Sequence, residues 1–175
     1  MLMLTFTGRT VDLSNFRAED INLEDIAHAL AHLPRFGGHT LVPYSVAQHS
    51  LHVARHVRAT HPDLELLALL HDASEAYLGD VIRPVKELIG PIYRSFEDKL
   101  SEVIWTTLTG KPTNRLPDVI KSADDAVLDT ERRHLFGLPD DATPRAVNGV
   151  LDVWPARWAK TKWLKRFGEL TEKSA

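Results

Sequence analysis

The chain has 175 residues, of which 43% are apolar and 26% are charged, and its formal net charge is −3. This length and composition predict a single globular domain over residues 1–175 with its own hydrophobic core. The slightly negative charge argues against a general attraction to nucleic acid. The absence of cysteine excludes disulfides and thiolate chemistry, whereas nine histidines leave many candidates for metal binding.

No apolar run is long enough to cross a membrane, and the N-terminal MLMLTFTGRT lacks the charged start and long apolar core of a signal peptide. We therefore expect a cytoplasmic protein that neither enters a membrane nor forms a stable complex with nucleic acid.

The first elements are predicted to be a hairpin and a helix. Residues 2–13 alternate loosely around a central glycine, which predicts a short β-hairpin lying on a helical body. A helix is predicted to begin after Asn22, which can cap its N-terminus. His28 and His32 are four residues apart on this helix, a spacing that allows a metal pair. We favour an exposed polar face instead, because no third ligand is indicated.

Arg35 and Phe36 follow this helix and precede two glycines, and an arginine beside an aromatic residue can bind a phosphate and a base. The next helix is predicted to start at Ser45, because Ser45-Val46-Ala47-Gln48 forms a capping box, and to run to about residue 60. Its spacing leaves open whether His49 or the pair His52 and His56 supplies a metal ligand.

The most informative stretch reads LLALLHDASEAYLGDVIRPVK, over residues 66–86. Its apolar run ends on His71 and Asp72, two polar side chains that need partners once buried. Glu75 lies four residues after His71, so a continuous helix would place all three side chains on one face. An isolated His-Asp dipeptide is most simply interpreted as a hydrogen-bonded pair in the core.

The end of the same stretch predicts a loop. Gly79 is expected to end the helix in a left-handed conformation, and Asp80 follows in the loop. Pro84 prevents the helix from continuing. The sequence thus places a second acidic residue beside the polar cluster.

Two of the remaining predicted helices have packing as their expected role. The helix at residues 92–108 carries Phe96, Leu100 and Ile104 at helical spacing, which predicts a core-facing stripe. The helix at residues 154–173 mixes tryptophans with lysines and could touch a membrane or a partner. We favour packing of its aromatic side chains on the body of the protein.

The other predicted helix begins at Pro117 and runs to about residue 136. Asp124 flanks the apolar stripe of this helix, so its carboxylate can reach the interior. Helix spacing leaves Asp125 and Asp129 open as alternatives in register.

The run HDASE, followed by GD and PVK, resembles the signature of the HD-domain metal-dependent phosphohydrolases. It is most similar to bacterial 5'-deoxynucleotidases and to phage relatives that hydrolyse deoxynucleoside triphosphates. The segments SVAQHS and KSAD resemble the first and last metal-binding segments of that family. The resemblance covers roughly residues 27–128 and implies an all-α HD-domain bundle, here with a small N-terminal hairpin.

The resemblance also implies roles for residues. It selects the metal ligands His49, His71, Asp72 and Asp124. Imidazole and carboxylate ligands suit one divalent transition metal ion such as Co, Mn, Fe or Zn, which would activate water and polarise a phosphoryl group.

For the substrate, the resemblance assigns contacts to Arg35 and Phe36. Two carboxylate ligands cancel the charge of the ion, so Arg35, with Lys86 second, is expected to bind the phosphate. Glu75 can transfer a proton, and Asp80 is expected to position the sugar or the nucleophile.

We therefore expect an enzyme that hydrolyses 2'-deoxynucleotides, in the first place a 5'-deoxynucleotidase that converts a deoxynucleoside monophosphate to deoxynucleoside and phosphate. The alternatives are a deoxynucleoside triphosphohydrolase, a non-catalytic nucleotide-binding regulator, and a helical interaction module that uses the Trp-rich tail. We expect the small-molecule substrate to be its main partner, and the chain to form a homo-oligomer, a dimer or larger.

Overall fold

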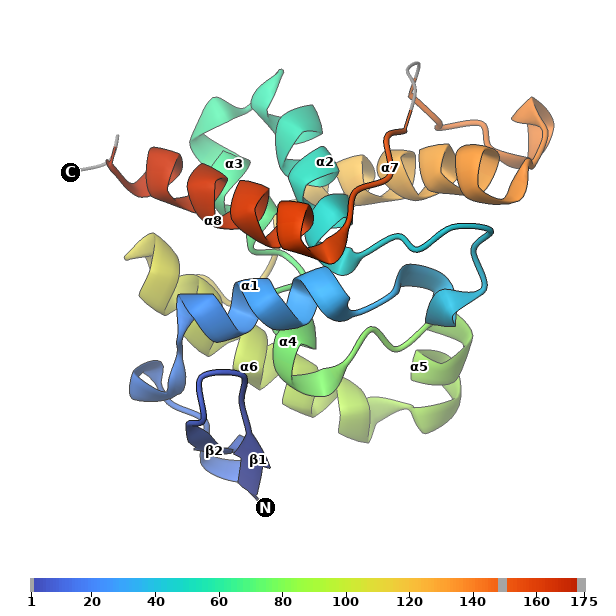
Figure 1. The fold of residues 1–175 in the computed structure, drawn as a ribbon. Helices are drawn as coiled ribbons and strands as arrows, with labels where there is room; N and C mark the ends of the chain where they lie inside the picture. The colour runs from blue at the N-terminus through green and yellow to red at the C-terminus, as the bar shows by residue number, and fades with distance from the viewer. Residues whose placement is uncertain (1, 148–150, 173–175) are drawn as a thin grey trace.

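The computed structural model describes residues 2–147 and 151–172, and within them the chain forms eight α-helices and one two-stranded sheet (Figure 1). The helices are α1 (Leu23–His32), α2 (Val46–Arg58), α3 (Glu65–Leu69), α4 (Glu75–Leu78), α5 (Arg83–Ile89), α6 (Pro91–Thr109), α7 (Asp118–Phe136) and α8 (Ala156–Glu172). The predicted all-α fold with a small N-terminal hairpin is confirmed.

The hairpin pairs β1 (Leu2–Leu4) with β2 (Thr10–Asp12) in antiparallel register, with Met3 opposite Val11. A 3₁₀ turn begins at the next residue, so the hairpin ends one residue before its predicted limit. Its turn is fixed to α1, because the backbone N–H and the hydroxyl of Thr7 donate to the two carboxylate oxygens of Asp25, at 2.7 and 2.9 Å.

Helices α1 and α8 lie side by side across α2 and α3 (Figure 1). The side chains of Asn22 and Ser45 cap α1 and α2 by accepting backbone N–H groups at 3.1 and 3.3 Å, as their sequences predict. The amide of Gln48 does not complete the capping box, because it binds the backbone of the segment before α8. The interior is apolar and includes Ile26, Leu30, Val53, Leu69, Leu70 and Ile104.

Helix α8 packs its aromatic side chains as we favoured. Trp163 is fully buried and stacks on Phe167, while Trp158 remains 54% exposed. Lys160 donates to Glu24 of α1 at 2.6 Å. The helix covers most of the predicted range 154–173, whose last residue lies outside the described residues. In the part of the chain that is described, no helix is long and apolar enough to cross a membrane.

The predicted continuous helix through His71 and Glu75 is wrong. Helix α3 ends at Leu69, residues 70–74 form a turn, and α4 starts at Glu75. The reason is the carbonyl of Leu70, which accepts the indole N–H of Trp105 at 2.8 Å and the backbone N–H of Ala73 at 2.9 Å. A helix would instead give that carbonyl to the residue four positions later. His71 and Asp72 therefore lie on the turn between two short helices.

Two smaller predictions also need correction. Gly79 does end α4, but with φ 82° and ψ 157° it adopts an extended conformation that is essentially restricted to glycine, not the left-handed cap. Phe96 of α6 is 42% exposed, whereas Leu100 and Ile104 on the same helix are buried. The core-facing stripe of α6 therefore begins later than predicted, because the N-terminal part of α6 extends past the body with α5 (Figure 1).

Candidate metal centre

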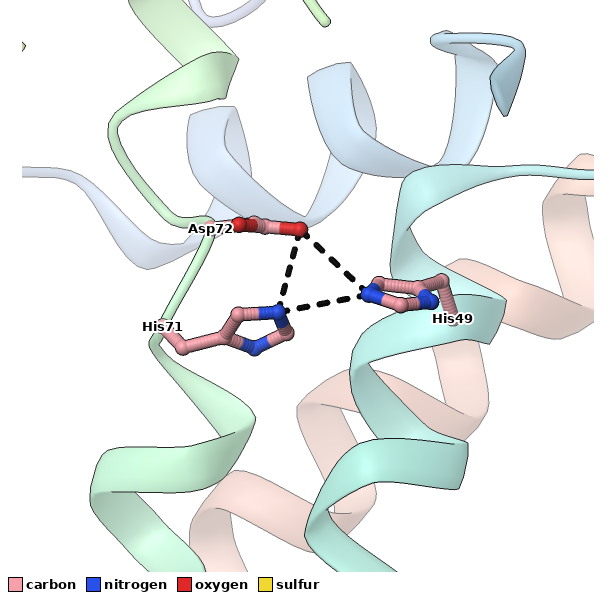
Figure 2. A group of neighbouring side chains, drawn as sticks. All are labelled: His49, His71 and Asp72. Carbon is pink, nitrogen blue, oxygen red and sulfur yellow. Dashed lines mark hydrogen bonds and ion pairs between the residues drawn. The ribbon is translucent and has the colours of Figure 1, made fainter. Parts of the chain in front are cut away.

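His49, His71 and Asp72 point toward one another (Figure 2). His49 comes from α2, and the other two come from the turn after α3. The Nε2 atoms of the two histidines are 3.3 Å apart. Oδ2 of Asp72 lies 3.1 Å from Nε2 of His71 and 3.6 Å from Nε2 of His49. These three atoms surround one point although 22 positions separate the two histidines.

Asp124 of α7 completes the predicted set, since its Oδ1 lies 3.1 Å from Nε2 of His49. The side chains of Asp125 and Asp129, the two alternatives to Asp124 on this helix, point elsewhere. Asp125 pairs with Arg145 at 2.8 Å, and Asp129 accepts from the same guanidinium at 3.1 Å. Of the three aspartates, Asp124 is therefore the one that the structure brings to the cluster.

The other histidines lie away from this cluster. The rings of His28 and His32 stack on each other at 4.1 Å, and His28 also stacks on Phe6. His52 packs its ring against Trp154 at 5.7 Å. His56 is exposed. The spacing of His52 and His56 therefore does not create a second pair of ligands at the cluster.

Hydrogen bonds on the far side of each ring orient the two histidines of the cluster. Nδ1 of His49 lies 2.7 Å from Oε1 of Glu131, and Nδ1 of His71 lies 2.8 Å from the carbonyl of Ala68. Both of these partners are acceptors, so each Nδ1 carries the hydrogen in the neutral ring. The lone pair of each Nε2 then faces the cluster, as a metal ligand requires.

Glu131 is the residue that sequence reasoning missed. It is fully buried on α7 and holds two predicted site residues, His49 through Oε1 and Arg35 through Oε2, which accepts Nη2 at 3.1 Å. Burial raises its pKa, but the neighbouring His49 and Arg35 lower that pKa to about 2, so Glu131 is ionised. Its spacing of seven residues from Asp124, two turns along one helix face, is the signal that could have found it.

Arg35 is surrounded by carboxylates. Its Nη1 lies 3.9 Å from Oδ2 of Asp72 and 4.0 Å from Oδ2 of Asp80. Burial lowers the pKa of Arg35, but Glu131, Asp72 and Asp80 raise that pKa by more than burial lowers it. The guanidinium therefore stays charged. Its Nε is buried without a hydrogen-bond partner among the described residues. Arg35 thus brings its positive charge to the cluster and still has donors available.

Phe36 has a left-handed backbone, with φ 56°. This conformation costs a non-glycine residue about 1–3 kcal/mol and is typical of functional sites. Hydrogen bonds at the base of the loop maintain it, from the N–H of Arg35 to the carbonyl of Tyr44 at 2.9 Å and from Val46 to Leu33 at 3.1 Å. The strained backbone places the Phe36 ring on the wall of the pocket beside the cluster.

Glu75 and Asp80 also line that pocket. Burial, together with repulsion by Asp72 and Asp80, raises the pKa of Glu75 well above its usual value. Burial likewise raises the pKa of Asp80. Oε2 of Glu75 and Oδ2 of Asp80 are buried without a hydrogen-bond partner within the described chain. Lys86 lies 3.6 Å from Glu75 and 2.6 Å from Glu97.

The pocket has a volume of about 230 Å³ and opens directly on the cluster. Seven of the nine predicted site residues line it: Arg35, Phe36, Asp72, Glu75, Asp80, Lys86 and Asp124. His49 and His71 lie behind Asp72, buried. The structure therefore brings all of the predicted site residues to one place, from five separate segments of the chain.

The donor set fits a metal ion. The ligand atoms of His49, His71 and Asp72 all lie within 4.8 Å of one another, so this buried cluster can hold one ion. Burial and Arg35 lower the pKa of His49, but Glu131 and Asp124 raise it to about 10. A proton therefore competes with a cation for this site.

Comparison with known proteins places the chain in a family. No family model matches it. It is 34% identical to the uncharacterized protein YfdR of Escherichia coli, over 96% of this chain and 94% of YfdR. The chain belongs to the YfdR family. An uncharacterized protein of Rhodobacter capsulatus is 36% identical over 81% of this chain and 82% of its own length. The names of these YfdR relatives give no reaction, so the chemistry has to be argued from the site.

Proposed function

We propose that this member of the YfdR family is a divalent-metal-dependent phosphohydrolase that acts on 2'-deoxynucleotides, in the first place as a 5'-deoxynucleotidase. One observation carries the proposal. A cluster of two histidines and two aspartates opens on a pocket that also contains an arginine, a lysine and two buried carboxyl groups. The resemblance of the HDASE and KSAD segments to HD-domain phosphohydrolases supports the same reaction.

His49, His71, Asp72 and Asp124 would hold the ion, and their nitrogen and oxygen donors suit Mn, Fe, Co or Zn. Such an ion, when bound, supplies the Lewis acidity that polarises a phosphoryl group and lowers the pKa of water. Glu131 and the carbonyl of Ala68 keep both imidazoles in the tautomer that the ion requires.

Arg35 orients the phosphate in this proposal. Its hydrogen bond to Glu131 fixes the guanidinium, while Nη1 is beyond hydrogen-bond distance of Asp72 and Asp80. Nη1 can therefore donate a charge-assisted hydrogen bond to a phosphate oxygen. Because two aspartates already cancel the charge of a divalent ion, this arginine supplies the positive charge that the phosphate needs.

Glu75 is the proton-transfer group. Its raised pKa extends the protonated form to higher pH than in an ordinary glutamate, and a protonated carboxyl can donate to the leaving 5'-oxygen of the sugar. Phe36 lines the same pocket and provides an aromatic face for the base, and Asp80 accepts a hydrogen bond from the sugar. Lys86 keeps the positive end of its side chain next to Glu75 and balances part of the acidic charge.

A triphosphohydrolase is the second candidate because of two further cations. Arg83 and Arg132 also line the pocket, and they would serve the additional phosphates of a nucleoside triphosphate. Both arginines already face aspartates, Arg83 at 3.6 Å from Asp125 and Arg132 at 3.7 Å from Asp129. We therefore prefer the monophosphate as substrate.

The deciding experiment measures bound metal and product release on one preparation. The purified protein is loaded separately with Mn, Co, Fe and Zn and screened against deoxy- and ribonucleoside mono- and triphosphates. We expect orthophosphate from deoxynucleoside monophosphates, with ribonucleotides slower. Release of tripolyphosphate from triphosphates would select the second candidate. Metal binding without any turnover would leave a nucleotide-binding regulator, and absence of metal binding would refute the proposal.

A further inference from the structure

A second pocket, of about 330 Å³, lies on another side of α2. Its walls come from α2, from α8 and from the segment that leads into α8, and Glu65 of α3 contributes to them. The pocket contains five basic side chains, Arg55, Arg58, Lys162, Lys165 and Arg166, and three acidic ones. This surplus of positive charge is local, because the whole chain has a net charge of −3.

The basic side chains differ in their partners. Arg166 is saturated, since it binds both carboxylate oxygens of Glu65 at 2.8 and 2.7 Å and Glu169 at 2.6 Å. Arg55, Arg58 and Lys162 have no carboxylate within 4.0 Å among the described residues. Their charges lie around a concave surface, where the potential of neighbouring cations adds and attracts anions.

One residue on the wall of the same pocket has a buried polar atom without a partner in the described chain. His52 lines it, and Nε2 of His52 is buried with no hydrogen-bond partner in the described chain. Buried polar atoms are nearly always satisfied in folded proteins, so an atom of this kind indicates a missing partner. The ammonium group of Lys162, which also lines the pocket, lies 4.8 Å from the centre of the Trp154 ring. An anion in the pocket would meet the cations next to His52 and Trp154.

Stabilisation of helix ends explains only part of this arrangement. Arg55 and Arg58 lie in the last turn of α2, where the helix dipole favours cations. Lys162 and Lys165 lie within α8, far from its C-terminal end, yet they line the same pocket. The convergence of cations from two helices is therefore a property of the pocket.

We propose that this pocket, which we call the α2–α8 pocket, binds a small organic polyphosphate at a site separate from the metal centre. A compact anion suits it better than a nucleic acid strand or a membrane surface. The pocket is concave and of small-molecule size, and Asp152 and Glu169 on its walls would repel an extended polyanion. His49 of the metal centre and His52 of the α2–α8 pocket both belong to α2, so the two sites share one helix.

The test is a calorimetric titration of the metal-loaded full chain with tripolyphosphate and, separately, with a deoxynucleoside triphosphate. The variant Arg55→Ala/Lys162→Ala removes two unpaired cations of the α2–α8 pocket. Its matched control, Arg94→Ala/Lys111→Ala, removes one exposed arginine and one exposed lysine elsewhere. Arg35→Ala reports on binding in the other pocket. We expect tripolyphosphate affinity to fall at least about tenfold in the first variant, since two charge-assisted contacts to the anion are lost.

The same affinity should be retained in the control and in Arg35→Ala, and binding should weaken with added salt. Unchanged affinity in Arg55→Ala/Lys162→Ala would overturn the proposal, and so would binding that Arg35→Ala abolishes. Tighter binding of the triphosphate than of tripolyphosphate at this site would identify a nucleotide as the ligand, and equal affinity would identify the phosphate chain alone. A single-stranded oligonucleotide that binds far more tightly and displaces tripolyphosphate would replace the proposal with a nucleic-acid site.

Discussion

Two arginine–glutamate pairs in this molecule differ in how completely the arginine is hydrogen-bonded. Where α8 packs on α3, Arg166 of α8 uses its three nitrogens on Glu65 and Glu169, at 2.6 to 2.8 Å. Beside the histidine cluster, Arg35 makes one hydrogen bond to Glu131 at 3.1 Å, and its Nε has no partner among the described residues. Both arginines are mostly buried, with side chains that are 18% and 12% exposed.

The difference shows which pair is structural. A pair that stabilises a fold needs every buried donor satisfied, because an unsatisfied donor costs about 1–3 kcal/mol. The Arg166 pair meets that condition, whereas the Arg35 pair does not and lies next to Asp72 and Asp80, whose charges are close but not bonded to it. Arg35 therefore has donors that the described residues do not satisfy, as the proposed contact with a phosphate requires.

The largest effect is expected at Asp72. Asp72→Ala removes a carboxylate that lies within 3.6 Å of both histidine Nε2 atoms, so metal binding and hydrolysis should both be abolished. The helical content should be retained, because the side chain lies on a turn at the pocket and not in the apolar core. Metal analysis, turnover and circular dichroism of one preparation check this. Full activity in a metal-loaded variant would remove Asp72 from the ligand set.

Replacing the structural arginine should affect stability alone. Arg166→Met leaves Glu65 buried without its partner, which should lower the free energy of unfolding by about 3 kcal/mol. Metal content and turnover should remain normal at a temperature where the variant is folded. Lys165→Met is the matched control, because that lysine is 75% exposed and should contribute less than about 1 kcal/mol. A loss of metal in Arg166→Met would contradict the separation of the two pairs.

Glu75→Gln tests the role of the Glu75 carboxyl, which lines the pocket beside the metal centre. The variant keeps the shape and hydrogen bonding of the side chain but cannot transfer a proton. Turnover should fall by about a hundredfold or more, the usual scale for a general acid–base group, while metal content stays near normal. Loss of metal together with activity would make Glu75 a ligand or the support of one. Unchanged turnover would shift the proton transfer to Asp80.

The sequence predicts the helices and their caps better than the break in the helix after Leu69. The helices, their caps and the polar residues of the 66–86 stretch follow from local rules of periodicity and capping, which each segment carries in itself. The break after Leu69 does not, because it depends on Trp105, a residue 35 positions away that donates to Leu70. Local patterns contain no signal for a competing donor of that kind.

The site shows the same limit. The family resemblance selects His49 over His52 and Asp124 over its neighbours, and the geometry brings those residues together. The role of Glu131 depends on contacts with residues 82 and 96 positions earlier, so no local pattern displays it. The pairing of Arg35 with a buried carboxylate also changes the expected charge balance, since in the proposed function this guanidinium would be shared between Glu131 and the phosphate.

Glu131→Gln measures how far the missed residue controls the centre. The amide has one acceptor oxygen for two donors, so it can accept from Arg35 or from Nδ1 of His49 but not from both, and it lacks the charge that orients and polarises the imidazole. Metal affinity should fall by about 10- to 100-fold, the range found for residues that support a ligand. Asp129→Asn is the matched control, since it is buried on the same helix and binds Arg145 instead of the cluster. Equal metal affinity in both variants would reduce Glu131 to a packing residue.

The smallest effect concerns His52, which lies on α2 between the two regions. Burial lowers its pKa to about 4 from the usual 6.5. The unfolded chain therefore binds a proton more readily than the folded one between those pH values, and stability falls as pH decreases from 6.5 toward 4. At pH 5 this loss amounts to about 2 kcal/mol, because one pKa unit corresponds to 1.36 kcal/mol.

His52→Phe keeps a ring between Tyr44 and Trp154 but cannot be protonated. Denaturant unfolding of the metal-loaded wild type and variant at pH 7.5 and pH 5.0 gives the comparison. The wild type should lose about 2 kcal/mol more than the variant on acidification, and the difference should vanish above pH 6.5, where both side chains are neutral in both states. Equal losses would mean that His52 titrates normally in the folded protein. The loss of stability on acidification would then come from protonation of the carboxylates around Arg35. The surroundings of His52 and of the metal centre would then differ less than the structure indicates.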